Sequence, residues 1–207
     1  MTRLHAEHGL TLMEVALVLI STLVLVGALT PTLAAVVRNA ENTAATNAMT
    51  IIRDAVLAMV TTDSQRITTT GSQLGSATLV ELIVSDGDTP REVSVTGSAR
   101  WQVAVDAATG LTDFIESHLV LNDPISSPLS YSTGGGQPWR GAYITAPVDP
   151  DPWGNRYGVN VQYLGGGAAG TNDVVVWSSG RDEEVDTAFT ANPLAAGDED
   201  LIVLVES

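Results

Sequence analysis

Cysteine and lysine are both missing from this chain of 207 residues. Without cysteine the chain can form no disulfide, no thiolate zinc site and no cysteine nucleophile, so its loops can be cross-linked only by packing or by a metal with other ligands. Nine arginines against 24 acidic residues leave a formal net charge of -15. Because phosphate binding needs a clustered basic face, we expect no nucleic-acid partner.

Histidine is scarce as well, and two of the three histidines lie in the first nine residues. His118 therefore has no second histidine with which to form a metal site or a catalytic triad, and we expect it in the core or in solvent. The acids Asp149 and Asp151 stand next to Pro150 and Pro152, where such residues usually shape turns. No nucleophile with a base is identifiable, so the sequence predicts a protein that is not an enzyme.

The N-terminal part of the chain contains a long apolar run. Between residues 10 and 37 the only charged side chain is Glu14. A run of this length can span a bilayer as a helix. The preceding leader, residues 1–9, carries Arg3 and is weakly basic, which favours a cytoplasmic N-terminus and places the rest of the chain on the opposite side of the membrane.

A signal peptide cleaved after Ala34 or Ala35 is one alternative for this run, and a plain membrane anchor is another. Glu14 argues against a signal peptide, because a carboxylate near the bilayer centre costs about 2.5 to 3.5 kcal/mol and a signal peptide gains nothing from it. No Lys, Arg or His lies between residues 10 and 37 to pair with it. We therefore expect the partner of Glu14 to come from elsewhere.

The residues around Glu14, H-G-L-T-L-M-E-V at positions 8–15, resemble the prepilin cleavage signal of the type IV pilin-like family. The resemblance implies that a prepilin peptidase cuts after Gly9 and that the new amino group on Leu10 is methylated, although the family most often has phenylalanine there. It also implies that Glu14 pairs with the amino terminus at Leu10 of a neighbouring subunit, which sets the stagger between subunits. Pro31 stands where pilins commonly carry a proline that loosens the helix.

The resemblance also implies a location and an architecture. The chain would be a single-pass protein of the inner (cytoplasmic) membrane, with its head outside the cytoplasm and with copies of itself and other pilin-like subunits as partners in a filament. The expected fold is α+β, a pilin fold in which a long N-terminal helix packs on a small antiparallel sheet followed by a C-terminal acidic loop. Its parts would be a leader at 1–9, a transmembrane and assembly helix at 10–37, an amphipathic continuation at 38–62 and a globular head at 63–207.

The segment after residue 37 has the spacing of one helical face. We expect a continuous helix from about residue 10 to about residue 60, roughly 75 Å long at 1.5 Å per residue, with its second half packed on the head. A coiled-coil seam is the alternative, but sustained heptads are lacking. The apolar face is expected to contain Ala44, Ala48, Ile51, Ile52, Ala55, Val56 and Met59.

The head shows weaker signals. Residues 101–105 alternate like a strand, residues 111–119 have helical spacing, and residues 157–164 and 173–177 read as a hairpin. Three tryptophans, Trp139, Trp153 and Trp177, are expected in its core. The motif D-P-W-G at 151–154 resembles a signature of the major pseudopilins of type II secretion systems.

The C-terminal third ends in a run of carboxylates. Such crowding is costly unless water or a hard cation with oxygen ligands neutralises it, so a solvated acidic loop and a metal site both remain open. In the pseudopilin family this loop binds calcium, and by that resemblance Asp182, Asp198 and Asp200 are the metal ligands. Glu183 departs from the family, which usually has glycine after the first acid.

Three functions follow from these features. The first is a structural subunit of a pseudopilus in type II protein secretion, and the second is a major or minor pilin of a type IV pilus. The long insert at residues 71–123 departs from a minimal pseudopilin and keeps the pilin open. The third is a calcium-binding adhesin released by signal peptidase, which predicts a mature N-terminus after residue 34 or 35 instead of at Leu10.

Overall fold

The computed structural model describes residues 11–69, 71–72, 78–92, 97–125, 130–164, 172–190 and 195–206. The chain forms two compact units, residues 1–41 and residues 42–207. The leader and the expected processing residues Gly9 and Leu10 lie outside the described residues, as do residues 165–171 between the two halves of the predicted hairpin.

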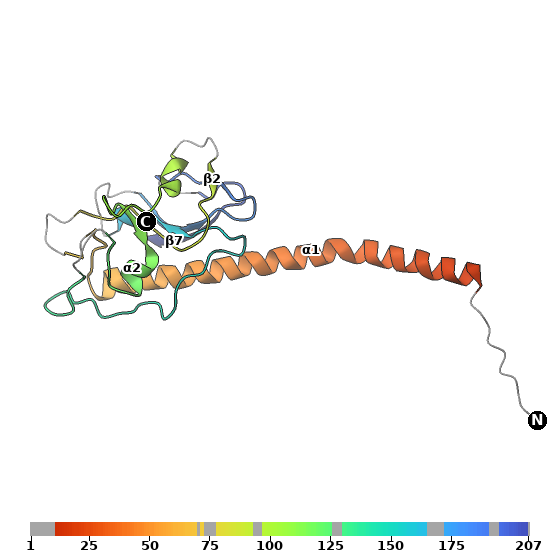
Figure 1. The fold of residues 1–207 in the computed structure, drawn as a ribbon, viewed down its shortest axis with the longest axis horizontal. Helices are drawn as coiled ribbons and strands as arrows, with labels where there is room; N and C mark the ends of the chain where they lie inside the picture. The colour runs from red at the N-terminus through yellow and green to blue at the C-terminus, as the bar shows by residue number, and fades with distance from the viewer. Residues whose placement is uncertain are drawn as a thin grey trace, which may run out of the picture. The chain divides into compact units, whose positions relative to one another are not determined.

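One helix, α1 (Leu12–Leu57), runs for 46 residues and ends in a π-helical turn, η1 (Ala58–Thr62). The predicted helix from about 10 to about 60 is therefore confirmed for the described residues, and Figure 1 shows it as a continuous coiled ribbon. The helix continues through Pro31. Thr11 begins it, because its hydroxyl oxygen accepts a hydrogen bond from the backbone N–H of Glu14, as an N-cap residue does.

The part of α1 in the first unit presents apolar side chains to its surroundings. Every residue from 11 to 40 is exposed, including Leu23 at 78%. The hydroxyls of Ser21, Thr22 and Thr30 each donate to the carbonyl oxygen four residues earlier, at 2.8 Å. These polar groups thus have partners inside the helix and need no water. The helix is long and apolar enough to cross a membrane.

In the second unit α1 buries one face against the sheet. The buried face is displaced by one residue at its start from the predicted one, because Ala45 and Met49 are fully buried while Ala44 and Ile51 are exposed. One residue turns the helix by about 100°, so the predicted stripe of alanines lies beside the core instead of in it. Ala44, Ala48 and Ile51 line an open groove of about 400 Å³ whose other wall lies between residues 144 and 152. The buried residues of α1 are Ala45, Met49, Ile52, Ala55 and Val56.

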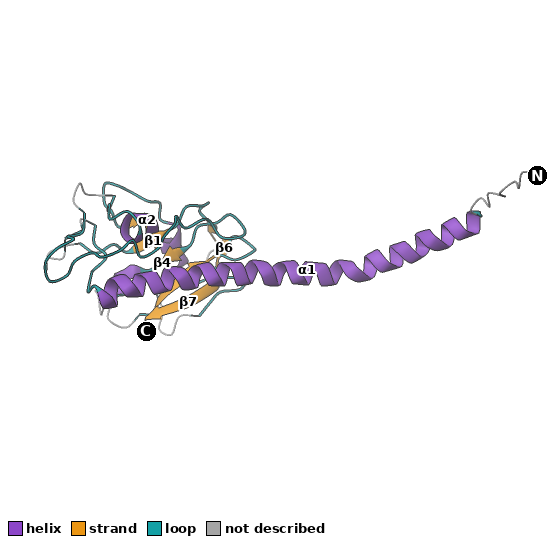
Figure 2. Ribbon diagram, turned by 90° about the horizontal axis from the view of Figure 1, so that it is seen from below, coloured by secondary structure: helices purple, strands orange, loops and turns teal. Residues whose placement is uncertain are grey.

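The main sheet has five strands in the order β3-β1-β4-β5-β7. Its strands are β1 (Leu82–Val84), β3 (Thr112–Phe114), β4 (Gly158–Val159), β5 (Val174–Ser178) and β7 (Leu201–Glu206). Strands β4 and β5 pair antiparallel, as the predicted hairpin requires, with Val159 opposite Val176. Figure 2 shows the sheet beside the C-terminal half of α1.

The expectation of a purely antiparallel sheet is wrong. Strands β1 and β3 are parallel, with Ile83 opposite Asp113. A parallel pair needs a crossover between its strands, and here the chain between them contains β2 (Arg91–Glu92) and a 3-10 turn, η2 (Ser98–Gln102). Strand β2 forms a second, two-stranded parallel sheet with β6 (Glu184–Val185). The fold is α+β, with a mixed five-stranded sheet and a parallel two-stranded one.

Two local predictions need correction. The segment predicted as a strand at 101–105 begins in η2, because Trp101 turns inward and is fully buried. The segment predicted as a helix at 111–119 is split into strand β3 and a short helix, α2 (Ile115–Leu119). A last 3-10 turn, η3 (Val161–Tyr163), follows β4. Tertiary packing overrides the local pattern in both segments.

Stacked aromatic rings form part of the core of the head. Trp101 stacks on Trp177 with ring centroids 5.1 Å apart and planes at 19°, and Phe189 meets Trp101 edge-on at 4.7 Å. The Trp101 indole N–H donates to the carbonyl oxygen of Thr187 at 3.1 Å. The prediction for Trp177 is confirmed. Trp139 and Trp153 are only partly buried.

Candidate metal centre and processing segment

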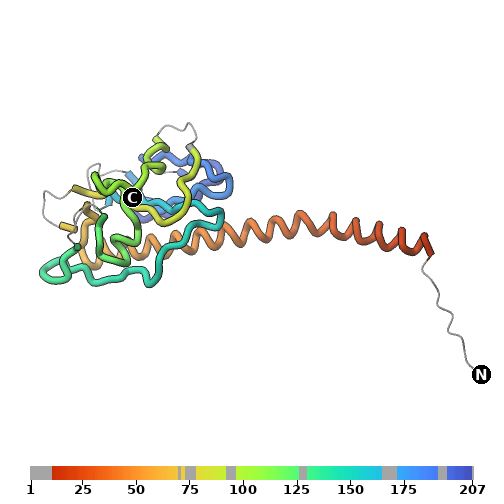
Figure 3. The backbone as a smooth tube through the Cα atoms, viewed as in Figure 1, coloured from red at the N-terminus to blue at the C-terminus, as the bar shows by residue number. Residues whose placement is uncertain are grey.

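The acidic loop brings three carboxylates together. Oxygen atoms of Asp182, Asp186 and Asp198 all lie within 4.8 Å of one another. Asp182 precedes β6, Asp186 follows it directly, and Asp198 stands shortly before β7. Figure 3 traces the blue C-terminal part of the chain through these turns, beside the yellow-green segment that contains β2. Two distant stretches of the loop therefore converge on one place.

Two glycines make this convergence possible. A Cβ on Gly180 would overlap the carbonyl oxygen of Glu199, and Gly180 also has a left-handed φ of 66°. A Cβ on Gly197 would overlap the side chain of Asp186. Only glycine can occupy such close backbone contacts without displacing the neighbouring segment.

Asp200, predicted as a ligand, lies outside this trio. Its side chain is buried, and its Oδ2 accepts hydrogen bonds from the backbone N–H groups of Asp186 at 3.0 Å and Thr187 at 2.6 Å. Burial raises the pKa of Asp200, an effect that these hydrogen bonds oppose. Through these hydrogen bonds Asp200 fixes the backbone at Asp186. The third carboxylate of the trio belongs to Asp186 instead of Asp200.

Electrostatic repulsion within the loop favours a bound cation. Partial burial and then the carboxylates of Asp182, Glu184 and Asp198 raise the pKa of Asp186. Calcium–oxygen bonds of about 2.3 to 2.6 Å allow two ligand oxygens on one ion to lie up to about 5 Å apart. The trio fits inside one such shell, so these residues could hold a metal ion.

The D-P-W-G motif is a structural anchor for the loop. Asp151 is buried, and its Oδ1 accepts hydrogen bonds from the backbone N–H groups of Trp153 at 3.0 Å and Asn155 at 2.8 Å. Its Oδ2 accepts a hydrogen bond at 2.7 Å from the hydroxyl of Ser178, the last residue of β5. Burial raises the pKa of Asp151. The motif therefore fixes the point at which the chain leaves β5 for the acidic loop.

Glu14, the predicted assembly residue, takes part in a capping box. Its Oε2 accepts hydrogen bonds from the backbone N–H and the hydroxyl of Thr11, at 2.8 and 3.0 Å, while Thr11 accepts from the N–H of Glu14 at 3.3 Å. This reciprocal pattern stabilises helix N-termini and is the local role open to the carboxylate. Pro31, the other predicted assembly residue, lies inside α1 in the same unit.

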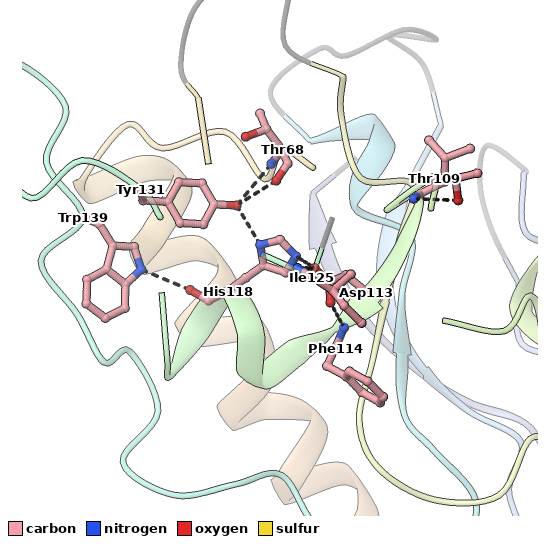
Figure 4. A network of polar contacts seen from close by, with 9 residues as sticks. Thr68, Thr109, Asp113, Phe114, His118, Ile125, Tyr131 and Trp139 are labelled. Atoms are coloured by element: carbon pink, nitrogen blue, oxygen red, sulfur yellow. Dashed lines mark hydrogen bonds and ion pairs between the residues drawn. The ribbon is translucent and has the colours of Figure 1, made fainter. Parts of the chain in front are cut away.

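His118 belongs to a buried polar network that the sequence analysis missed (Figure 4). Its Nδ1 lies 2.7 Å from the hydroxyl of Tyr131, and its Nε2 lies 3.1 Å from Oδ2 of Asp113. The Tyr131 oxygen accepts a hydrogen bond from the N–H of Thr68 at 3.2 Å. Asp113 and His118 are fully buried and Tyr131 is 2% exposed, so the network joins parts of the head from within its core.

Comparison with known proteins adds no relative: no family model, no curated protein and no solved structure matches this chain. The function must therefore be argued from the residues and their arrangement.

Proposed function

We propose that this chain is a pilin-like structural subunit that is made as a precursor and polymerises in the inner membrane. The filament that it forms is the pseudopilus of a type II secretion system. The observation that carries the proposal is helix α1. One uninterrupted helix presents exposed, largely apolar residues from 12 to 37 and then buries a stripe beginning at Ala45 against the sheet. Such a helix can anchor a head to a membrane without a flexible linker.

Processing is the first step of the proposed pathway. A prepilin peptidase cuts after Gly9 and the new amino group on Leu10 is methylated. Glu14 then lies four residues from a positive terminus. A carboxylate in lipid is costly unless it is paired, so the charge on Glu14 favours the one stagger in which the terminus of a neighbouring subunit meets it.

The mature N-terminus tests this pathway directly. The chain is produced together with a prepilin peptidase, and the N-terminal peptide is identified by mass spectrometry. Methylated Leu10 is the expected result. A mature start near Val36 would instead select the secreted adhesin, and an unprocessed leader would contradict the proposal.

Two substitutions separate assembly from capping at Glu14. Glutamine replaces glutamate well in a capping box, so Glu14→Gln keeps the cap but removes the charge. Thr11→Ala removes the cap but keeps the charge. We expect Glu14→Gln to reduce filament yield at least tenfold and Thr11→Ala to reduce it by less than twofold, as measured by sedimentation of sheared filaments. The opposite order would assign Glu14 a purely local role.

We further propose that Asp182, Asp186 and Asp198 bind calcium. Their oxygen ligands and close spacing suit a hard cation. Partial burial and then repulsion from the neighbouring carboxylates raise the pKa of Asp186, and a cation would relieve that repulsion. The ion would join the turn after β5 to the segment before β7 and so stiffen the C-terminal loop. This role is structural, and the ion takes part in no reaction.

A type IV pilus pilin is the second candidate. The insert at residues 71–123 supports it, because strands β1 and β3 of the main sheet come from this segment and enlarge the head beyond that expected for a minimal pseudopilin. Deletion of the gene distinguishes the two candidates. Loss of protein secretion with intact surface pili supports the pseudopilus, whereas loss of surface pili with normal secretion supports the pilin.

A further inference from the structure

Strand β7 forms an open apolar edge of the main sheet. In the part of the chain that the structure describes, β7 pairs with β5 alone, from Ser178 opposite Leu201 to Val174 opposite Glu206. All five residues of β5 are buried, whereas none of the six residues of β7 is. Leu204 is 51% exposed. The sequence L-I-V-L-V of residues 201–205 therefore offers apolar side chains on a strand whose described pairing is on one side only.

The usual protections of a strand edge are weak here. Edge strands are commonly blunted by lysine, by proline or by a bulge in the middle of the strand. Residues 201–206 contain no lysine and no proline. The one irregularity in pairing falls between Val174 and Val175, near the end of β7. The N–H and C=O groups along its outer side can therefore receive another extended chain.

Charge decides what kind of chain can pair there. Glu199 is exposed just before β7 and is not part of the acidic trio, and Glu206 is the last residue of β7. In an antiparallel pair of two copies, Glu206 of each copy would approach Glu199 of the other. Like charges placed opposite each other in a sheet are destabilising, and each copy carries a net charge of -15. A second copy is therefore a poor partner, and a strand with basic ends is a good one.

We propose that β7 is a docking edge for an extended segment of a different protein, with alternating apolar side chains and Lys or Arg at both ends. The segment adds a strand to the main sheet beside β7. Backbone hydrogen bonds supply affinity, Leu204 and its neighbours supply an apolar face, and the acidic flanks select basic ends. The proposal is independent of filament assembly, and either can fail without the other.

A designed peptide tests the edge. The probe alternates valine and threonine and carries two arginines at each end, and binding to the full chain in lipid nanodiscs is followed by fluorescence anisotropy. We expect saturable binding that weakens with salt, and protection of the amides of residues 201–206 from hydrogen exchange. A peptide with glutamate at its ends should bind at least tenfold more weakly, and one N-methylated on alternate backbone nitrogens should also lose at least tenfold.

A matched pair of variants locates the site. Leu204→Gln should weaken peptide binding about tenfold, the loss expected for one apolar side chain of this size, while Leu121→Gln should change it less than twofold. Leu121 is an equally suitable exposed leucine, at 63%, and lies outside the sheet. The proposal is overturned by equal binding of the N-methylated peptide, by binding without protection of β7, by no binding at millimolar peptide, or by a dimer of the free chain that Leu204→Gln dissolves.

Discussion

At the scale of single residues, the buried acid Asp113 joins several segments of the head. Its Oδ1 accepts a hydrogen bond from the N–H of Phe114 at 2.6 Å, and its Oδ2 accepts one from the N–H of Ile125 at 2.8 Å and also meets His118. Burial raises the pKa of Asp113, but His118 and these N–H groups lower it more, so the net pKa lies below its ordinary value. The charged carboxylate is therefore the stabilising form.

The first prediction concerns Asp113→Asn. A depressed pKa contributes stability that is present above the unfolded-state pKa of about 3.9 and is lost as the pH falls through the lower folded value. We expect the substitution to lower the free energy of unfolding by about 3 kcal/mol at pH 7 and by much less near pH 2. Chemical denaturation across this pH range measures it. Asp149→Asn, at an exposed acid, should have a small effect, and a pH-independent loss for Asp113→Asn would refute the ionic origin.

Glu183 is a second informative residue. It adopts a left-handed φ of 60°, the conformation that glycine adopts without strain, at the position where the pseudopilin resemblance expects glycine. A non-glycine residue pays about 1 to 2 kcal/mol for this conformation. We expect Glu183→Gly to raise the free energy of unfolding by about 1 kcal/mol. Glu183→Ala removes the same charge without relieving the backbone, so an equal gain in that variant would assign the effect to charge instead.

At the scale of elements, the two parts of α1 differ in how their apolar side chains are arranged. Its first part carries apolar side chains on every side, whereas its second part has a buried stripe and an exposed side. A helix that is apolar all round suits a lipid environment, and a striped helix suits packing on a sheet. The change from one kind of surface to the other occurs within α1, without a break in the helix.

Two adjacent isoleucines test the assignment of the buried stripe. Ile52 is 1% exposed and Ile51 is 57% exposed, although both belong to the same turn of α1. We expect Ile52→Ala to lower the free energy of unfolding by about 3 kcal/mol through loss of packing and the cavity it leaves. Ile51→Ala should cost less than about 1 kcal/mol. Similar costs at both positions, measured by thermal unfolding in detergent, would mean that the register of the stripe is different.

At the scale of the whole molecule, charge is distributed unevenly. The apolar run from 10 to 37 carries only Glu14, and most of the net charge of -15 belongs to the rest of the chain. Self-repulsion destabilises such a head, and any salt relieves it partly by screening. A specific ion site must therefore show an effect beyond that of ionic strength.

Calcium should stabilise the chain more than sodium chloride of equal ionic strength does. At a calcium concentration about 100 times the Kd, binding to the folded state adds about 2.7 kcal/mol, which raises Tm by roughly 5 °C or more. Asp182→Asn should abolish this difference, while Asp149→Asn should retain it. If the two salts raise Tm equally in the unchanged protein, the trio is only a solvated acidic surface.

Sequence alone determined those features that depend on residues near one another in the chain. The length of α1, its apolar first part and the pairing of β4 with β5 follow from periodicity and composition, because helix and hairpin contacts are local. The chemistry of the acidic loop was also predictable, since a run of carboxylates allows only water or a cation as its neutraliser.

Only the tertiary structure decided which of these residues meet. The sequence predicted Asp200 as the third ligand, but its buried carboxylate accepts hydrogen bonds from backbone N–H groups, and Asp186 is the third member of the trio. Nothing in the spacing of the sequence distinguishes these two acids. Trp101 stacks on Trp177, which lies 76 residues later in the sequence. The segment predicted as a strand at 101–105 therefore begins in a 3-10 turn. Such contacts depend on how distant segments converge, and the convergence is set by packing of the whole head instead of by any local pattern.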